Sequence, residues 1–186
     1  MRRLIVANWK MNKTPSEAVA FAQDFLASRE KDAQAHDRPE VAFAPPYTAL
    51  AGLQTALAGT LTGLAAQDVS AHPPGAFTGE IAAEMLADLG CRYCLVGHSE
   101  RRTLWQETSE IVAKKATRLC QNGITPILCV GETREEHEAK RTSDIVLEMI
   151  RSSLPPAGTP GRDSLVVAYE PIWAISQNRE DSWVAP

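Results

Sequence analysis

The stretch of residues 91–130 decides the fold, and it begins with the apolar run CRYCLV at residues 91–96. The polar segment GHSERR follows at residues 97–102, and TSEIVAKKATRLCQ, with the spacing of a helix, occupies residues 108–121. Asn122 and Gly123 end that helix before a second apolar run, ITPILCV, at residues 124–130. A strand, a helix and a second strand in this order predict a βαβ unit whose strands are parallel.

The same alternation continues on both sides of this unit. We expect further strands at residues 3–7, 41–44, 62–66 and 164–169, and further helices at residues 15–29, 47–57, 80–89 and 133–152. Thr14 and Glu17 predict a capping box around Pro15 at the start of the first helix. Because the strands are continuously apolar, they are typical of a parallel sheet covered by helices. The sequence therefore predicts an α/β fold with six strands and five helices, either a doubly wound sheet or a (β/α) barrel.

Composition and charge exclude several classes of protein. The chain has 186 residues, of which 44% are hydrophobic and 23% charged, as in a globular protein of one domain. Its net charge of −4 gives no reason to expect a nucleic acid or an anionic membrane as a partner. No apolar run approaches the ~18 residues of a membrane span, and the apolar run after Arg3 is shorter than a signal peptide requires. We therefore expect a cytoplasmic protein.

The motifs that would indicate a metal or a nucleotide cofactor are weak or absent. Cys91 and Cys94 form a C-x-x-C pattern, but an offset of three within a strand directs the two side chains to opposite faces. Cys120 and Cys129 are predicted to be buried thiols, near a helix end and in a strand. Neither the dinucleotide-binding nor the P-loop glycine pattern occurs. We therefore expect no metal site at these cysteines, and the sequence gives no main support for a dinucleotide or a P-loop nucleotide.

Polar residues follow three of the predicted strands at their carboxyl ends, where α/β folds place their sites. Asn8 and Lys10 are two residues apart, so they present a donor and a cation on one side. His98 precedes a short helix whose positive end favours neutral imidazole. Glu170 lies between an apolar strand and Pro171, where partial desolvation makes a carboxylate more basic. Each residue alone also fits an ordinary surface position, but together they suit proton abstraction next to a carbonyl.

Five motifs, in order along the chain, resemble the triosephosphate isomerase family. They are ANWKMN at residues 7–12, GAFTGE at 75–80, VGHSERR at 96–102, CVGET at 129–133 and AYEPIWAI at 168–175. The resemblance implies a (β/α)₈ TIM barrel that interconverts dihydroxyacetone phosphate and D-glyceraldehyde 3-phosphate through an enediolate, in glycolysis and gluconeogenesis. It also implies a homodimer that needs neither cofactor nor metal and has a triose phosphate as substrate.

The resemblance further implies the roles of individual residues. Glu170 is expected to be the general base, and His98 the neutral electrophile that polarises the carbonyl. Lys10 is expected to be the cation near the substrate, with Asn8 as its hydrogen-bonding neighbour. Further residues have expected roles in substrate binding (Trp9), in support of the site (Glu100, Cys129) and in a loop that reaches into the second subunit (Phe77, Thr78).

The resemblance covers residues 1–175, which we take as one domain, whereas the tail at residues 176–186 matches nothing in the family's pattern. Because such barrels have about 250 residues, we expect an incomplete barrel of about six βα units without strands seven and eight and their phosphate-binding loops. Two other hypotheses remain open. One is an inactive isomerase fragment that serves only as a binding partner of full-length subunits, and the other is a different phosphate-binding barrel enzyme.

Overall fold

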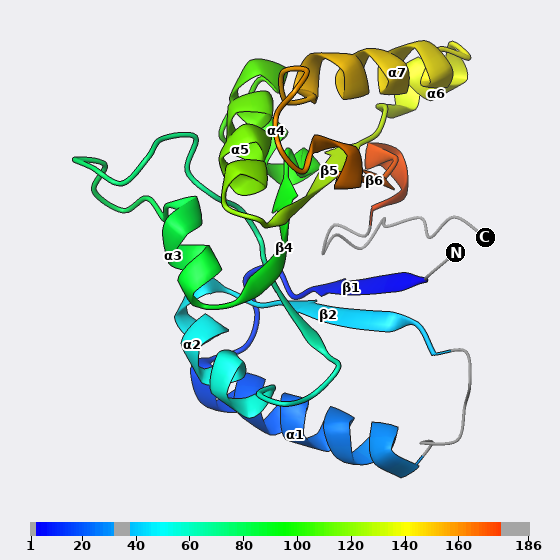
Figure 1. Cartoon of the computed structure of the whole chain (residues 1–186). Coiled ribbons are helices and arrows are strands. Elements are labelled where there is room, and N and C mark those ends of the chain that lie inside the picture. The colour runs from blue at the N-terminus through cyan, green and yellow to red at the C-terminus, as the bar shows by residue number, and fades with distance from the viewer. Residues whose placement is uncertain (1–2, 32–37, 176–186) are drawn as a thin grey trace. The chain divides into compact units, whose positions relative to one another are not determined.

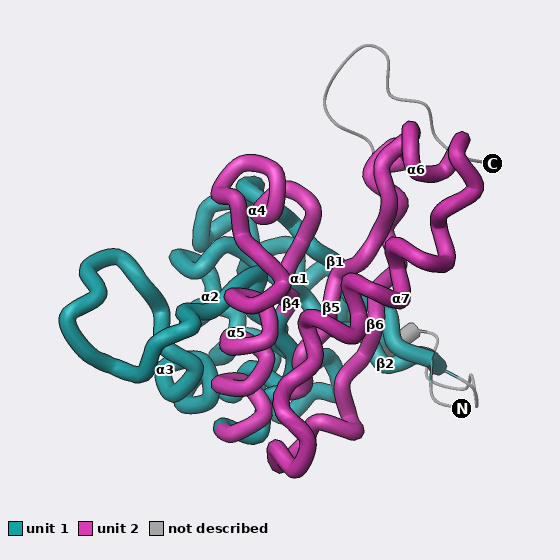
Figure 2. Tube along the Cα trace, turned by 90° about the horizontal axis from the view of Figure 1, so that it is seen from above, with its two compact units in different colours: residues 1–94, 122–124 teal, residues 95–121, 125–186 magenta. Residues whose placement is uncertain are grey.

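The computed structural model describes residues 3–31 and 38–175. The chain divides into two compact units, which Figure 2 shows in teal and magenta. The first consists of Met1–Cys94 with Asn122–Ile124, and the second of Leu95–Gln121 with Thr125–Pro186. Strands alternate with helices in both units, and the paired strands are parallel. The predicted α/β class is therefore confirmed.

The first unit is built on parallel strands that pair in chain order (Figure 1). Its strands are β1 (Leu4–Asn8), β2 (Glu40–Ala44), β3 (Gly63–Ala66) and the first part of β4 (Cys91–Val96). Its helices are α1 (Pro15–Lys31), α2 (Tyr47–Ala56) and α3 (Ala83–Asp88). Asn8 lies opposite Ala44 in the register, so β1 and β2 end side by side.

An aromatic cluster forms much of the core of this unit. The ring of Phe43, on β2, lies with its centroid 5.0–5.7 Å from those of Trp9, Phe21 and Phe25. Two of these three contacts are edge-to-face, an arrangement that aromatic pairs favour. Phe43 is only 2% exposed and Phe21 is 39% exposed, so the cluster joins α1 to the sheet from the buried core out to the surface.

The second unit has its strands in register up to their carboxyl ends. They are β5 (Thr125–Val130) and β6 (Val166–Tyr169), and Val130 lies opposite Tyr169. The helices are α4 (Ser99–Leu104), α5 (Ser109–Gln121), α6 (Arg134–Glu138), α7 (Thr142–Ser153) and the 3₁₀ turns η1 (Arg162–Ser164) and η2 (Ile172–Ala174). Helices α5 and α7 pack on each other and on β5. Because β5 and β6 end together, the segments that follow them leave the sheet side by side.

The start of α1 confirms the predicted capping box. The Thr14 N–H donates to Glu17 Oε2 at 2.7 Å, and the Glu17 N–H faces Thr14 Oγ1 at 3.5 Å. Pro15 is the first helical residue, where its missing N–H costs nothing.

Two helix predictions are wrong. The predicted helix at residues 133–152 is split into α6 and α7, because Lys140 adopts a left-handed φ of 58° that a right-handed helix cannot contain. The predicted helix at residues 80–89 begins only at Ala83, since the Ile81 carbonyl instead accepts the Ser70 N–H at 2.8 Å. The described residues thus form seven α-helices and two 3₁₀ turns, not five helices.

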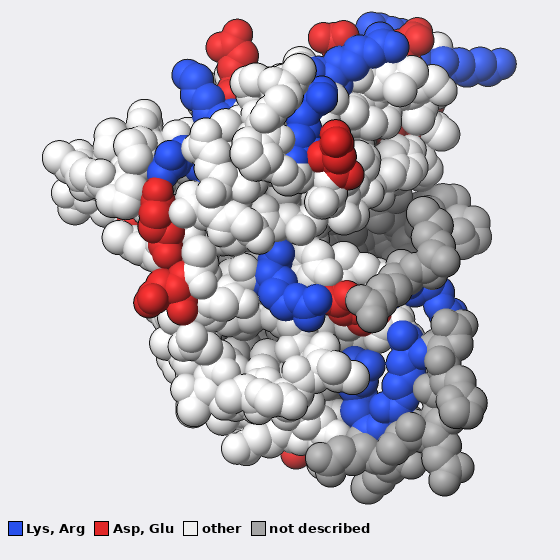
Figure 3. All heavy atoms as spheres, in the orientation of Figure 1, with Lys and Arg blue, Asp and Glu red and all other residues white. Residues whose placement is uncertain are grey.

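The cysteines, the helices and the surface charge bear on whether the protein could hold a metal, cross a membrane or bind a nucleic acid. All four cysteines are free and buried, with Cys120 in α5 and Cys129 in β5 as predicted. Within residues 3–31 and 38–175, no helix has both the length and the apolar character to cross a bilayer, and no three His, Cys, Asp or Glu residues are arranged to hold a metal ion. Figure 3 shows side chains of both charge signs on the face that it draws.

Candidate active site

A glycine turn after β4 brings His98 to the start of α4. Gly97 has a φ of 67°, and a side chain there would meet Arg102 Nη2 at 2.8 Å and Val112 Cγ2 at 2.9 Å. Glycine is therefore required for both backbone conformation and space. His98 is the N-cap residue of α4 and is 7% exposed. The predicted short helix after His98 is confirmed.

The hydrogen bonds of the His98 ring define its protonation state. Its Nδ1 accepts the backbone N–H of Glu100 at 3.2 Å. Because a nitrogen that accepts carries no proton, the proton of the neutral ring lies on Nε2. This Nε2 is 3.3 Å from Glu170 Oε2. The Glu100 carboxylate lies 3.6 Å from Nδ1, beyond hydrogen-bond distance, so the ring is arranged as a neutral donor through Nε2.

Glu170 follows β6 directly, and the strand ladder places its carboxylate beside His98. Its N–H donates to the Val130 carbonyl at 2.8 Å, which continues the pairing of β5 and β6 by one residue. One carboxylate oxygen, Oε1, accepts the Ser99 N–H at 3.0 Å, and the other faces His98. The side chain is 21% exposed, so it is largely shielded from water. Two of the predicted catalytic residues are thus brought together.

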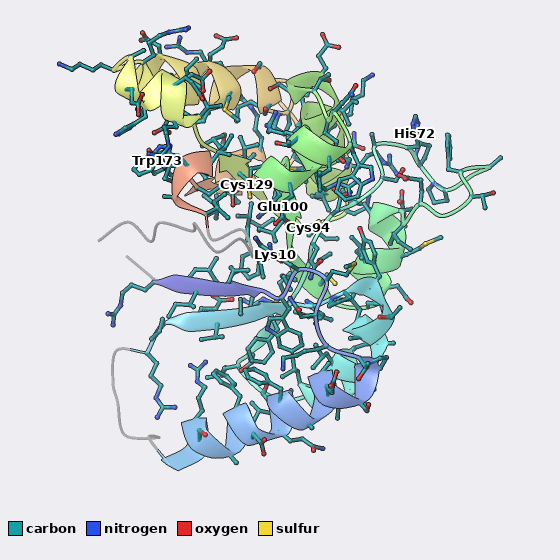
Figure 4. All side chains as sticks on the ribbon, turned by 180° about the vertical axis from the view of Figure 1, so that it is seen from behind. Lys10, His72, Cys94, Glu100, Cys129 and Trp173 are labelled. Carbon is teal, nitrogen blue, oxygen red and sulfur yellow. The ribbon has the colours of Figure 1, made fainter. Side chains whose placement is uncertain are left out.

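Cys129, labelled in Figure 4, lies on β5 and contacts the Glu170 carboxylate. Its thiol hydrogen-bonds to the Glu170 side chain and is almost fully buried. Burial raises the pKa of the Cys129 thiol well above its ordinary value, and the negative charge of Glu170 raises it further. The group is therefore a neutral thiol that can donate to the carboxylate.

Arg102 is a charged neighbour of this site that the sequence analysis missed. Its Nε donates to the Gly97 carbonyl at 2.9 Å, and its terminal nitrogens reach Ser109 Oγ on α5 and Ser153 Oγ on α7. Burial lowers the pKa of Arg102, and the negative charge of Glu170 is among the influences that oppose this. The guanidinium thus holds the turn that precedes His98. Arg102 ends the VGHSERR motif at residues 96–102, but nothing in that motif indicated that its guanidinium would reach α5 and α7.

A second carboxylate, Glu132, anchors the segment after β6 and was also missed. It is completely buried and receives hydrogen bonds from Tyr169 Oη at 3.0 Å, Trp173 Nε1 at 3.1 Å and Thr142 Oγ1 at 3.3 Å. Burial acts to raise the pKa of Glu132, but these hydrogen bonds outweigh it and hold the pKa below its usual value. These partners come from α7, β6 and η2, so the motifs CVGET and AYEPIWAI did not show by themselves that the side chains converge on Glu132.

Asn8, Trp9 and Lys10 belong to the first unit, at the end of β1. The Asn8 Oδ1 accepts the Lys10 N–H at 3.0 Å, and Gln67 Nε2 donates to the Lys10 carbonyl at 2.8 Å. These two bonds hold the backbone of Lys10, whose φ is 50°. The Trp9 ring packs against Phe43 in the core, with ring centroids 5.3 Å apart. Gln67 is a further residue that sequence reasoning did not identify.

Phe77 and Thr78 lie on the long loop between β3 and α3, which extends to the left in Figure 1. Both residues are exposed, and the Phe77 ring stacks on His72 with centroids 4.2 Å apart. The loop therefore presents an aromatic surface to solvent. Its contact with a second subunit stays a prediction.

The Glu170–His98 pair combines two functions that enolisation requires. A shielded carboxylate can remove a proton from carbon. A neutral N–H beside it can donate to the oxygen of the adjoining carbonyl, where negative charge develops. The pair is therefore suited to a substrate with a C–H bond next to a carbonyl.

Comparisons with known proteins identify the family that the chain resembles. The sequence model of the family described as triosephosphate isomerase matches residues 3–182. The triosephosphate isomerases of Thermus thermophilus and Leifsonia xyli are each 48% identical to the chain, which covers 70% of either protein, with 96% of the chain aligned in both cases.

A crystal structure of the triosephosphate isomerase of Bartonella henselae resembles the chain with a TM-score of 0.80 at 32% identity. The match covers 93% of the chain and 69% of that protein. This likeness confirms the predicted TIM-barrel fold class. The sequence match runs seven residues past position 175, and the domain boundary proposed there stays a prediction.

Proposed function

Because the chain belongs to the triosephosphate isomerase family, we propose that it interconverts dihydroxyacetone phosphate and D-glyceraldehyde 3-phosphate. The supporting observation is the 3.3 Å approach of Glu170 Oε2 to His98 Nε2, the nitrogen that carries the proton. Family membership excludes a different phosphate-binding barrel enzyme, and the comparisons give no support to the inactive fragment.

In this reaction Glu170 removes a proton from one carbon of the triose and returns it to the neighbouring carbon. The carboxylate must first leave the Ser99 N–H, which occupies Oε1 in the structure. His98 donates its Nε2–H to the substrate oxygen and stabilises the enediolate. We assign Lys10 and Asn8 to the binding of substrate oxygens. Since the substrate is neither oxidised nor reduced overall, the residues need no cofactor.

The exposed Phe77–Thr78 loop supports the further proposal of a homodimer. We also propose that the protein works in the cytoplasm. An exposed aromatic ring on a protruding loop is suited to bury itself in a second copy. Light scattering after gel filtration should give twice the chain mass, and Phe77→Glu should give the monomer mass. A monomer in both cases would refute the dimer.

Replacement of the base tests the proposed reaction. Glu170→Gln keeps the shape of the side chain but cannot accept the proton, so kcat should fall by about 10²–10⁴-fold. Glu148→Gln, on the exposed face of α7, is the matched control and should retain full activity. Turnover in D₂O should place deuterium on the product carbon. An unchanged kcat in Glu170→Gln would show that Glu170 is not the base.

A further inference from the structure

Gly131 lies against the backbone of Glu170, just beyond the end of β5. A Cβ at Gly131 would be 2.6 Å from the Glu170 carbonyl carbon, 3.0 Å from Pro171 N and closest of all to the Glu170 carbonyl oxygen. Ordinary van der Waals contacts of a Cβ lie at 3.4–4 Å. All three neighbouring atoms are backbone atoms, so no rotation of a side chain could relieve the overlap. No residue larger than glycine therefore fits.

The requirement for glycine at this position is one of space alone. Gly131 is not among the glycines with positive φ, so its backbone conformation is open to other residues. Seven other glycines of the described residues do have positive φ, and five of these have no atom within 4 Å of an added Cβ besides their chain neighbours. Gly131 differs from them, since its φ is not positive but backbone atoms crowd the place that a Cβ would occupy.

Hydrogen bonds on both sides hold the Glu170 peptide against Gly131. The Glu170 N–H donates to the Val130 carbonyl at 2.8 Å, and the Ile172 N–H donates to the Glu132 carbonyl at 3.0 Å. The peptide between these two bonds cannot slide along β5 without breaking one of them. Pro171 adds stiffness because its φ is fixed by the ring. The distance between the Glu170 backbone and β5 is therefore set by the absence of a side chain at Gly131.

We propose that Gly131 is a positioning residue for the general base: its missing side chain lets the Glu170 backbone approach β5 closely enough for the carboxylate to reach Ser99 and His98. The inference rests on the proposed function. A methyl group at Gly131 would push the Glu170 carbonyl away by about 1 Å before an ordinary contact is restored, and a misplacement of about 1 Å costs about 100-fold in rate.

The test compares Gly131→Ala with Gly63→Ala, a strand glycine of the first unit. At Gly63 an added Cβ meets its nearest neighbour, Ala42 Cβ, at an ordinary 3.4 Å. We expect kcat to fall about 100-fold in Gly131→Ala, with little change in KM, because the substituted residue displaces the base. Gly63→Ala should retain the kcat of the unaltered chain. Equal kcat values in both variants would overturn the proposal.

A double-mutant cycle separates positioning from general damage. If Gly131 acts through Glu170, Gly131→Ala should lower kcat much less in a Glu170→Gln background than in the unaltered chain. The same loss in both backgrounds would overturn the proposal. Loss of the far-UV circular dichroism of the helices in Gly131→Ala would do so too, since it would make Gly131 a residue of general packing.

The Ser99 amide gives a readout that does not depend on turnover. It donates to Glu170 Oε1 at 3.0 Å, so replacing this carboxylate by Glu170→Gln should shift its NMR signal in the unaltered chain and in a Gly63→Ala background. In a Gly131→Ala background this shift should disappear. If the unaltered chain shows no isomerase activity but the Ser99 result holds, the proposed function fails and the positioning by Gly131 stands. A Ser99 signal that Glu170→Gln still shifts in the Gly131→Ala background would refute it.

Discussion

Gly97→Ala should be among the most destabilising single-methyl changes in the second unit, for two separable reasons. The φ of 67° costs an L-residue about 1–2 kcal/mol. The added methyl would also lie 2.8 Å from Arg102 Nη2 and 2.9 Å from Val112 Cγ2, and overpacking of this kind costs about 1–3 kcal/mol. We therefore expect the free energy of unfolding to fall by about 2–5 kcal/mol.

Gly158→Ala is the matched control, since its φ of 83° is also left-handed but nothing lies within 4 Å of the added Cβ. In Gly158→Ala the free energy of unfolding should fall only by the cost of a left-handed φ in an L-residue, about 1–2 kcal/mol. Urea unfolding followed by circular dichroism measures both variants, with the slope checked for a constant m value. If the two variants lose the same free energy, the crowding around Gly97 contributes nothing and the reasoning is refuted.

Three further predictions concern the titratable groups. The native thiols should resist iodoacetamide at pH 8, and all four should react after unfolding. The reason is that burial raises the pKa of the Cys91 thiol to about 12 and that of the Cys129 thiol well above its usual value. Rapid labelling of the native protein, detected by mass spectrometry, would contradict this. Glu132→Gln should cost about 1–3 kcal/mol at pH 7, since the buried donors lose a charged acceptor. As the folded pKa of Glu132 is depressed, this stabilisation is present above the pKa of the unfolded chain and is lost as the pH falls through the folded value, so the gap between the variant and the unaltered chain should close in acid urea titrations. Nitrogen-15 NMR of His98 should show an unprotonated Nδ1 and a protonated Nε2 at neutral pH, and a protonated Nδ1 would rule out the neutral electrophile.

Short-range signals allowed much of the fold to be predicted. Strand β4 occupies the predicted residues, and the helix after His98 begins where the sequence indicated. The wrong helix predictions have a different kind of cause, which apolar periodicity does not reveal. The split between α6 and α7 depends on a left-handed Lys140, a conformation that lysine rarely adopts and that no pattern of apolar residues indicates.

The residues of the candidate site were also only partly predictable from the sequence. His98 and Glu170 could be identified because each follows an apolar strand within a few residues. Arg102 and Glu132 stand in quoted motifs, but their structural roles could not be predicted, because partners such as Ser153 and Trp173 lie tens of residues away. A polar group becomes part of a network only when distant segments fold around it.

The sequence by itself determined the alternation of strands and helices, the glycine and proline turns, and the residue types at the strand ends, because these depend on neighbours within one or two turns of chain. Only the tertiary structure decided which nitrogen of His98 carries the proton and how closely Glu170 approaches Gly131. Both properties depend on atoms that folding brings within about 3 Å of one another, where hydrogen bonds and steric overlap become strong.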